Sequence, residues 1–303
     1  MSLIKRPCPV CSSSERSEVV ILKQDHFTKN NPSYNLGKIP ALGLSVEQEY
    51  PIVRCVECGL IYSLYHLDDE GEKIVYNEII DSGISKRKVL TIGRRLGDLK
   101  RWHNLLSLTG KGGKDSIAIK LLDYGCGWGT FLQVAHGPGV TAIGFDVTSW
   151  KIEFARSNGV TVCESEKELL KHAPFDLCLS TSVLEHLHYP GEAVKAISRL
   201  MKPGGFAHIT CVIGDVYRDS RWENIKARVE RGEGIPKEIN PWEHLNYFTN
   251  ETFLNLMTAN GFTPVDGPEE AGGGIKTCVK TALKRKFPFL KNKHSVSGFW
   301  KKV

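Results

Sequence analysis

The chain has 303 residues, of which 41% are hydrophobic and 24% charged, and its formal net charge is +6. This length can hold a full α/β domain of about 150–200 residues and a smaller module, and the composition is typical of a soluble globular protein. No apolar run approaches the ~18 residues of a membrane span, and the first residues do not resemble a signal peptide. We therefore expect a cytoplasmic protein with no membrane partner.

Two Cys-x-x-Cys pairs stand in the N-terminal quarter, Cys8 with Cys11 and Cys55 with Cys58. Two residues between thiols let one tight turn direct both sulfurs at the same ion, and Gly59 relieves crowding after the second pair, where Ser12 follows the first. The pairs resemble the knuckles of a zinc ribbon, and four thiolates form the closed site of structural zinc. A redox pair or a metal-free module stays an alternative. The remaining cysteines stand singly, which favours a reducing compartment. We assign residues 1–75 to this module.

Residues 76–110 predict a helical connector with one apolar face. Basic residues gather here and again near the C-terminus. The first group comprises Lys86, Arg87, Lys88, Arg94, Arg95, Lys100 and Arg101, and the second comprises Lys280, Lys284, Arg285, Lys286, Lys291 and Lys293. We interpret both as solvated faces, and contact with RNA or an anionic substrate is the alternative.

The stretch 117–131 is the strongest local signal in the chain. An Ile/Leu-rich run, typical of a buried parallel strand, ends at Asp123 and is followed by Gly125, Gly127 and Gly129. Glycines let the backbone turn tightly and lie against a ligand. A helix start from Thr130 would then point free amides at a negative group. These features together predict a nucleotide-type site.

A second strand, 141–145, ends at Asp146, where a carboxylate can accept both hydroxyls of a ribose. The glycine spacing differs from the dinucleotide fingerprint, because one residue instead of two separates the second and third glycines and Thr130 stands at the expected third position. The loop resembles the first motif of the class I S-adenosylmethionine (SAM)-dependent methyltransferases. Residues 175–187 and 201–206 resemble that family's fourth-strand motif and the turn into its fifth strand.

The resemblance implies an α/β fold with a doubly wound, mostly parallel, seven-stranded Rossmann-like sheet over residues 111–303. It also implies that the connector helix covers the cofactor. The cofactor-binding residues it indicates are Asp123, Gly125, Gly127, Gly129, Asp146, Val147, Trp150, Glu164 and Ser180. Core packing accounts equally well for Trp150, and Glu164 precedes a helix capping box that begins at Ser165.

Two histidines are the candidates for the base. His186 follows the fourth strand, whose end borders the ligand crevice of an open parallel sheet. His244 lies in a substrate gate predicted over 214–249, in a segment similar to the His-Leu-x-Tyr-Phe-Thr segment of many small-molecule methyltransferases. Neutral histidine suits proton removal near pH 7. The alternatives are a core role for His186 and, for His244, a hydrogen bond that ties the gate to backbone carbonyls.

After the gate, Thr249 is a natural N-cap and Gly261 a stop for the last helix. Residues 262–265 are expected to form the sixth strand, but 270–303 show no pattern that places a seventh. The sequence leaves the oligomeric state open.

The chain is thus predicted to be a SAM-dependent methyltransferase with structural Zn²⁺. A four-cysteine module joined to such a core resembles methyltransferases of sugar, polysaccharide and secondary-metabolite pathways. We expect a carbohydrate-type or other small-metabolite acceptor, methylated on a hydroxyl or an activated carbon. The alternatives are an RNA methyltransferase that grips phosphate with the module and basic helix, and a non-catalytic SAM-binding scaffold.

Overall fold

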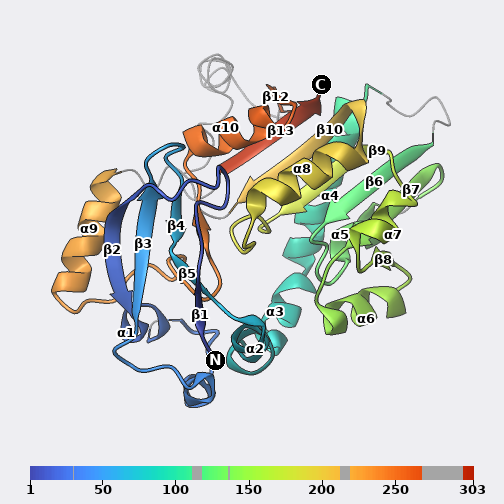
Figure 1. The fold of residues 1–303 in the computed structure, drawn as a ribbon. Helices are drawn as coiled ribbons and strands as arrows, with labels where there is room; N and C mark the ends of the chain where they lie inside the picture. The colour runs from blue at the N-terminus through green and yellow to red at the C-terminus, as the bar shows by residue number, and fades with distance from the viewer. Residues whose placement is uncertain (30, 111–117, 136, 212–218, 268–295) are drawn as a thin grey trace, which may run out of the picture.

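The computed structural model describes residues 1–303 except 30, 111–117, 136, 212–218 and 268–295 (Figure 1). The second basic group, Lys280–Lys293, and the start of the predicted gate therefore lie outside the described residues. Among the described helices, none is long and apolar enough to cross a membrane.

The N-terminal third forms two small sheets and a run of helices. Its elements are β1 (Leu3–Lys5), β2 (Arg16–Lys23), α1 (Gln24–Thr28), the 3₁₀ turn η1 (Leu36–Leu42), β3 (Glu49–Cys55), β4 (Ile61–Ser63), β5 (Tyr65–Leu67), α2 (Asp69–Ile74), the π-turn η2 (Val75–Ile79), α3 (Ser82–Val89) and α4 (Ile92–Leu108).

The rest of the chain alternates strands and helices. These are β6 (Ile119–Tyr124), α5 (Thr130–Val134), β7 (Val140–Phe145), α6 (Ser149–Ser157), β8 (Thr161–Cys163), α7 (Glu166–Leu170), β9 (Phe175–Thr181), α8 (Pro190–Leu200), β10 (Met201–Cys211), α9 (Asp219–Glu230), β11 (Asn246–Tyr247), α10 (Asn250–Ala259), β12 (Phe262–Val265) and β13 (Val296–Lys302).

The central sheet has seven strands in the order β12-β13-β10-β9-β6-β7-β8. Strands β10, β9, β6, β7 and β8 pair in parallel, while β13 runs antiparallel between β12 and β10. The predicted fold class is confirmed, and β13 is the strand that the sequence did not place. Since strand order reverses between β6 and β9, a ligand crevice is expected above their carboxyl ends.

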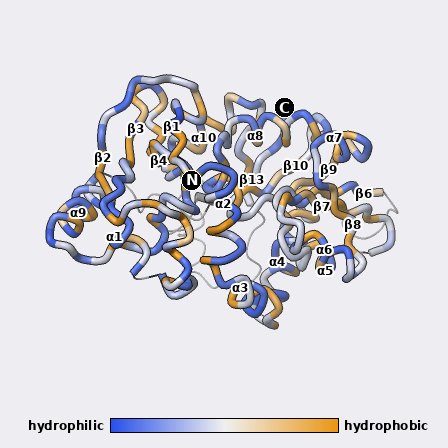
Figure 2. The backbone as a smooth tube through the Cα atoms, turned by 60° about the horizontal axis from the view of Figure 1, so that its bottom comes forward, coloured by the Kyte–Doolittle hydropathy of each residue, from blue (hydrophilic) through white to orange (hydrophobic). Residues whose placement is uncertain are grey.

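Helices cover both faces of this sheet. Neighbouring residues of β6 face opposite ways, Leu121 into a cluster with α4, α5 and α6, and Leu122 into a cluster with α7, α8 and α10. Burial on both faces explains why these strands read as continuous apolar runs. In Figure 2 the orange, hydrophobic stretches gather along the strands of the central sheet.

The N-terminal module and the predicted gate share one sheet and one core. Strand β11 from the gate pairs with β4, which gives the order β11-β4-β3-β2. Trp222 of α9 and Trp242 pack in the same buried cluster as Leu22 and Tyr50 of the module. The boundaries at residues 75 and 110 stay a prediction, but burial and strand pairing join these segments.

Candidate functional site: a glycine loop, a histidine pair and four cysteines

The glycine loop follows β6 in a conformation that only glycine adopts easily. Gly125, Gly127 and Gly129 have φ values of +82°, +52° and +70°. A Cβ on Gly125 would lie 2.3 Å from Cγ2 of Val183, and one on Gly129 would lie 2.9 Å from Cβ of Ala155. At Gly127, no described atom lies within 4 Å of that position. Gly125 and Gly129 thus allow Val183 and Ala155 to pack closely against the loop, whereas Gly127 faces open space.

Asp146 lies directly after β7, and its carboxylate turns toward this loop. Its Oδ2 accepts a hydrogen bond from the Gly127 amide at 2.8 Å, and its Oδ1 accepts one from the Thr148 amide at 2.9 Å. These bonds fix the carboxylate at the tip of the second strand, beside the loop.

Asp123 ends up in a buried acidic group that the sequence pattern does not reveal. The side chain is 4% exposed, and burial, Asp98 and Asp146 raise its pKa to about 8. Asp98, on α4, accepts hydrogen bonds from Thr130 at 3.0 Å and Arg101 at 2.5 Å. Asp98 therefore fixes the connector helix to the first residue of α5. The sequence shows it only as one polar residue among the charges of a helix.

Two tryptophans mark the side of the loop that faces the connector. The ring of Trp128 lies 4.9 Å from that of Trp150, and its indole nitrogen donates to Ser85 of α3 at 3.4 Å. The indole nitrogen of Trp150 donates to Asn77 of η2 at 3.3 Å. The Lys86 ammonium lies over the Trp128 ring at 5.6 Å. The connector therefore covers this part of the site, and Trp128 is a residue that sequence reasoning missed.

The remaining predicted cofactor residues occupy different surroundings. Val147 is 78% exposed, and Glu164 forms an ion pair with Arg156 at 2.5 Å on the surface. Ser180 is fully buried near the end of β9. Close by, Ser182 holds a positive φ of 55°, a strained conformation of the kind that gathers at functional sites. The structure thus groups the glycine loop, Asp146 and Trp150, whereas Glu164 is exposed and paired with Arg156.

The two candidate bases meet, although 58 positions separate them in the sequence (244 − 186). The rings of His186 and His244 lie edge to face with centroids 4.7 Å apart. Nδ1 of His244 lies 2.7 Å from the carbonyl oxygen of Glu238. A carbonyl only accepts, so Nδ1 carries a proton, and Nε2 is the nitrogen that has a lone pair whenever the ring is neutral. Burial and the neighbouring His244 hold the pKa of His186 well below its usual value.

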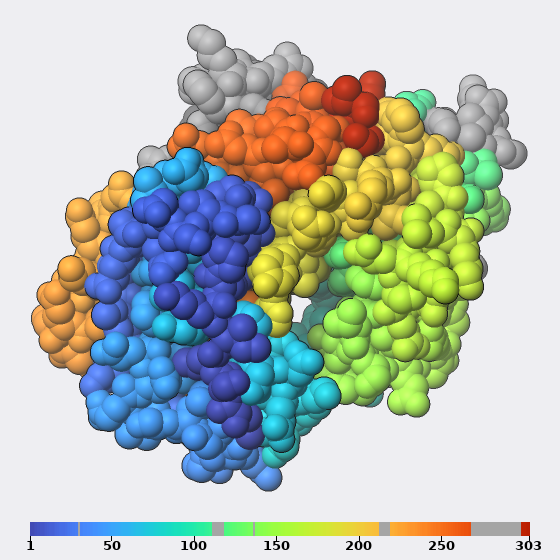
Figure 3. Space-filling view, in the orientation of Figure 1, coloured from blue at the N-terminus to red at the C-terminus, as the bar shows by residue number. Residues whose placement is uncertain are grey.

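Beside the histidine pair lies a hydrogen-bonded polar cluster. Oε1 of Glu243 accepts from the Tyr34 hydroxyl at 2.6 Å and from Nδ2 of Asn240 at 2.8 Å. Burial and Glu243 raise the pKa of Tyr76 well above its usual value. The module, the connector and the gate are distant in the sequence and thus meet at one polar cluster. Figure 3 shows the surface hollowed between the connector (cyan), the residues after β9 (yellow) and the β7–α6 region (green).

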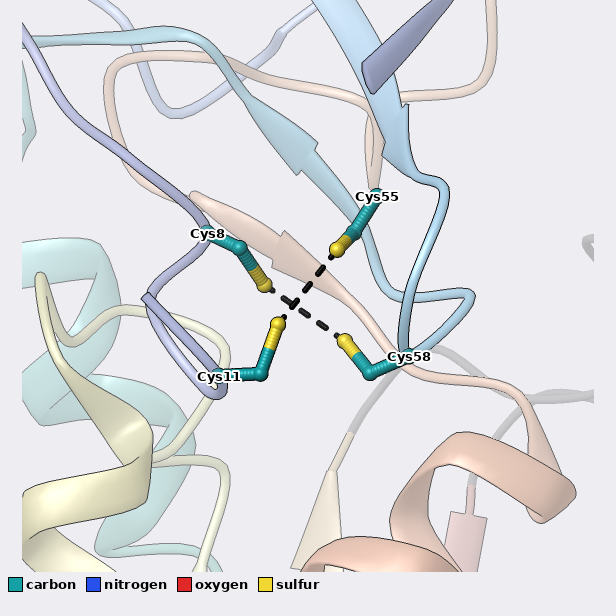
Figure 4. Close-up of side chains that lie close together, drawn as sticks. All are labelled: Cys8, Cys11, Cys55 and Cys58. Carbon is teal, nitrogen blue, oxygen red and sulfur yellow. Dashed lines mark hydrogen bonds between the residues drawn. The ribbon is translucent and has the colours of Figure 1, made fainter. Parts of the chain in front are cut away.

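The four cysteine sulfurs converge from two similar turns (Figure 4). Sγ of Cys8 lies 3.5 Å from that of Cys58, and the same distance separates Cys11 from Cys55. Each turn closes with a hydrogen bond from the residue after its second cysteine: Ser12 N to Cys8 O at 2.8 Å, and Gly59 N to Cys55 O at 3.1 Å. Both donors have positive φ, +62° and +75°.

This sulfur cluster suits a metal cation. Burial raises the pKa of Cys11 to about 11, while the hydrogen bond from Cys58 lowers the pKa of Cys8 to about 5. A cation between the sulfurs would favour the thiolate form of Cys11, and tetrahedral thiolate ligation is the ordinary zinc site. The donor set fits zinc.

Comparison with known proteins identifies the chemistry. Residues 92–266, more than half of the chain, match the family described as "Methyltransferase domain". The chain belongs to this methyltransferase family. The methyltransferase core that the motifs predicted is confirmed, and residues 1–91 lie outside the match.

Several similar curated proteins are named ubiquinone biosynthesis O-methyltransferases. That of Roseobacter denitrificans is 25% identical over 167 residues, which cover 49% of this chain and 61% of that protein. That of Citrobacter koseri is 26% identical over 179 residues, covering 52% and 71%. Among solved structures, a SAM-dependent methyltransferase from Mesorhizobium loti is 17% identical with a TM-score of 0.42, covering 65% of this methyltransferase and 96% of that chain.

Proposed function

We propose that this methyltransferase transfers the methyl group of SAM to a hydroxyl of a carbohydrate-type or other small-metabolite acceptor, with His244 as the base. The observation that carries the proposal is the histidine pair, in which Nδ1 of His244 faces a carbonyl oxygen and leaves Nε2 as the nitrogen that can accept a proton. A hydroxyl must lose its proton as the methyl arrives, and neutral imidazole is matched to that task near pH 7. The curated relatives also carry "O-methyltransferase" in their names.

Bound SAM would supply a methyl group on a cationic sulfur, which an acceptor oxygen attacks in line. The glycine loop and Asp123 would hold its methionyl part, and Asp146 its ribose. Asp123 suits an ammonium partner because a buried carboxylate whose pKa rises to about 8 gains most from a nearby cation. Trp128 and Trp150 offer aromatic faces for the adenine. Holding both reactants in line supplies much of the rate enhancement.

We infer the acceptor class from the polar cluster beside His244. The half-buried Glu243 carboxylate is held in one hydrogen-bond network with the buried Asn240 amide and Tyr34 hydroxyl. Such a set suits an acceptor that carries several hydroxyls. Of the first basic group, Lys86 lies over Trp128 and Phe154. Because Lys86 packs over these rings beside the proposed cofactor site, its position does not support the alternative of RNA binding.

We also propose that the four cysteines hold a structural zinc ion. Closed thiolate sites leave no position for a reacting water, so the ion would act on the fold and not on the methyl transfer. Metal analysis of the purified protein should give one zinc per chain. A metal-free protein in which all four thiols react with a thiol reagent would contradict this assignment.

The proposed reaction is tested by incubating the protein with SAM and separate pools of nucleotide sugars, phenols and total RNA, and measuring S-adenosylhomocysteine (SAH). We expect turnover with one small-molecule pool. His244→Ala should lower kcat by about 100-fold or more, in the range of general-base catalysis, with SAH affinity unchanged. His103→Ala, on the exposed side of α4, is the matched control. Unchanged turnover in His244→Ala would remove this residue from the chemistry, and turnover with RNA alone would overturn the acceptor class.

A further inference from the structure

Arg6 connects the cysteine module to both histidine-bearing segments. It lies between β1 and Cys8, and it is 1% exposed. Its Nη1 donates to the carbonyl oxygen of His188 at 2.7 Å, and its Nη2 donates to that of Leu245 at 2.6 Å. One guanidinium therefore holds the backbone two residues after His186 and one residue after His244.

The other contacts of Arg6 fix the guanidinium itself. Nε donates to Ser63 O at 3.0 Å, Nη2 also reaches Oδ1 of Asn246 at 3.2 Å, and the group lies 5.4 Å from the centre of the Tyr62 ring. These oxygen acceptors are neutral. Burying a cation against neutral groups is costly. In return for this cost, the planar guanidinium holds several carbonyl groups in one fixed arrangement, because its donors have fixed directions.

Asn246 completes the link between the two segments. Its Nδ2 donates to the carbonyl oxygens of Leu184 at 2.9 Å and Leu187 at 2.7 Å. The amides of Leu245 and Asn246 both donate to Glu185 O, at 2.7 and 3.1 Å. The segment around His186 and the segment around His244 are thus joined to each other, and Arg6 joins the pair to the module.

The first cysteine turn touches the same region independently of Arg6. A Cβ on Gly191, in the first turn of α8, would lie 3.3 Å from Pro9 O and 3.4 Å from Val10 O. The side chain of His188 also reaches back, with Nε2 2.5 Å from Oε1 of Glu72 and its ring 3.8 Å from that of His66. Movement of the Cys8–Cys11 turn would therefore displace the residues that follow His186.

We propose that the four-cysteine module sets the geometry of the acceptor side of the active site, with Arg6 as the positioning residue that transmits it. Cys8 stands two positions after Arg6, so an ion that fixes Cys8 also fixes where the guanidinium lies. Loss or oxidation of the cysteine site would displace the histidine pair while leaving the glycine loop and Asp146 in place. This inference rests on the proposed function of the histidine pair.

The test follows the imidazole signals of the ten histidines by NMR of ¹⁵N-histidine-labelled protein, together with SAH affinity by calorimetry and zinc content. Arg6→Lys keeps the charge but loses the fork. We expect it to shift the signals of His186 and His244, assigned with His186→Ala and His244→Ala, while His26 and His103 stay unchanged. The SAH Kd should stay within about twofold, which is less than 0.5 kcal/mol. Arg16→Lys, whose arginine donates to Ser14 O at 2.9 Å inside the module, should shift neither signal.

Because no acceptor is needed, this readout is independent of whether the proposed reaction is correct. Unmoved His186 and His244 signals in folded Arg6→Lys would overturn the proposal. So would a parallel loss of SAH affinity, since Arg6 would then act on the whole fold. If Arg6→Lys does not fold, Cys11→Ser decides, because Cys11 is the exposed ligand and Arg6 remains. The same two signals should shift in that variant with SAH binding retained, and a variant that lost zinc without shifting them would refute the coupling.

Discussion

Gly125→Ala and Gly127→Ala form a matched pair that separates packing from ligand binding. Both glycines hold positive φ, +82° and +52°, so each alanine carries a similar backbone penalty of about 1–2 kcal/mol. Only at Gly125 does the new methyl meet a neighbour, Cγ2 of Val183 at 2.3 Å. Overpacking of this kind adds about 1–3 kcal/mol. We therefore expect Gly125→Ala to lose about 2–5 kcal/mol of unfolding free energy and Gly127→Ala about 1–2 kcal/mol.

Ligand binding should show a different pattern. At Gly127 the methyl group enters open space in front of the loop, where we place the cofactor. SAH affinity should therefore fall by at least about tenfold, or 1.4 kcal/mol, in Gly127→Ala although this variant is the more stable one. Urea titration gives the unfolding free energies and calorimetry gives the SAH affinities. A Gly127→Ala protein that binds SAH as tightly as the wild type would refute the placement of the cofactor at this loop. Equal destabilisation of the two variants would refute the packing reasoning at Val183.

Three further predictions concern charge and strain. Asp123→Asn should stabilise the ligand-free protein at pH 7 by up to about 4 kcal/mol, which urea titration measures. The reason is that the pKa of Asp123 is about 8 in the folded protein and 3.8 in the unfolded chain, so folding disfavours the ionised carboxylate. Calorimetry should show weaker SAH binding by this variant. Burial lowers the pKa of His208 to about 4, so between pH 6.5 and 4 the unfolded chain is protonated at this residue and the folded chain is not. Up to about 3 kcal/mol of unfolding free energy is therefore lost as pH falls from about 6.5 to 4. His208→Phe should flatten this dependence of unfolding free energy on pH, and an unchanged dependence would assign the loss to other groups. Ser12→Gly should raise the unfolding free energy by about 1 kcal/mol, because Ser12 holds a φ of +62°; a lower denaturation midpoint would contradict the strain.

Local signals explain what the sequence could predict. Strand β12 has the predicted bounds, β7 includes the strand predicted over 141–145, and Thr249 caps α10 by accepting from the Thr252 amide. Each is marked by an apolar run, a cap or a stop that acts within a few residues. The four cysteines were likewise predictable, because their spacing already requires two similar turns. The structure brings their sulfurs together as expected.

Tertiary pairing explains what the sequence could not predict. Strand β13 is placed by its partners β10 and β12, and its fully buried Trp300 is followed by Lys301 and Lys302, so no alternating pattern marks it. Asp98 and Arg6 look like ordinary surface charges until the fold surrounds them. Their partners, Thr130 and the carbonyls after His186 and His244, lie in other segments of the chain.

The two sides of the proposed cleft differ in how the chain builds them. The cofactor side comes mostly from one continuous stretch, β6 to α6, where each residue is positioned by its own strand or turn. The proposed acceptor side takes Tyr34 from the module, His186 from the segment after β9, and Asn240 and His244 from the gate. No single segment can hold such a set, so its geometry depends on contacts between segments. Arg6, which is buried and donates several hydrogen bonds, lies at their junction. On our proposal, this residue lets a module outside the family match influence the acceptor side without touching the cofactor.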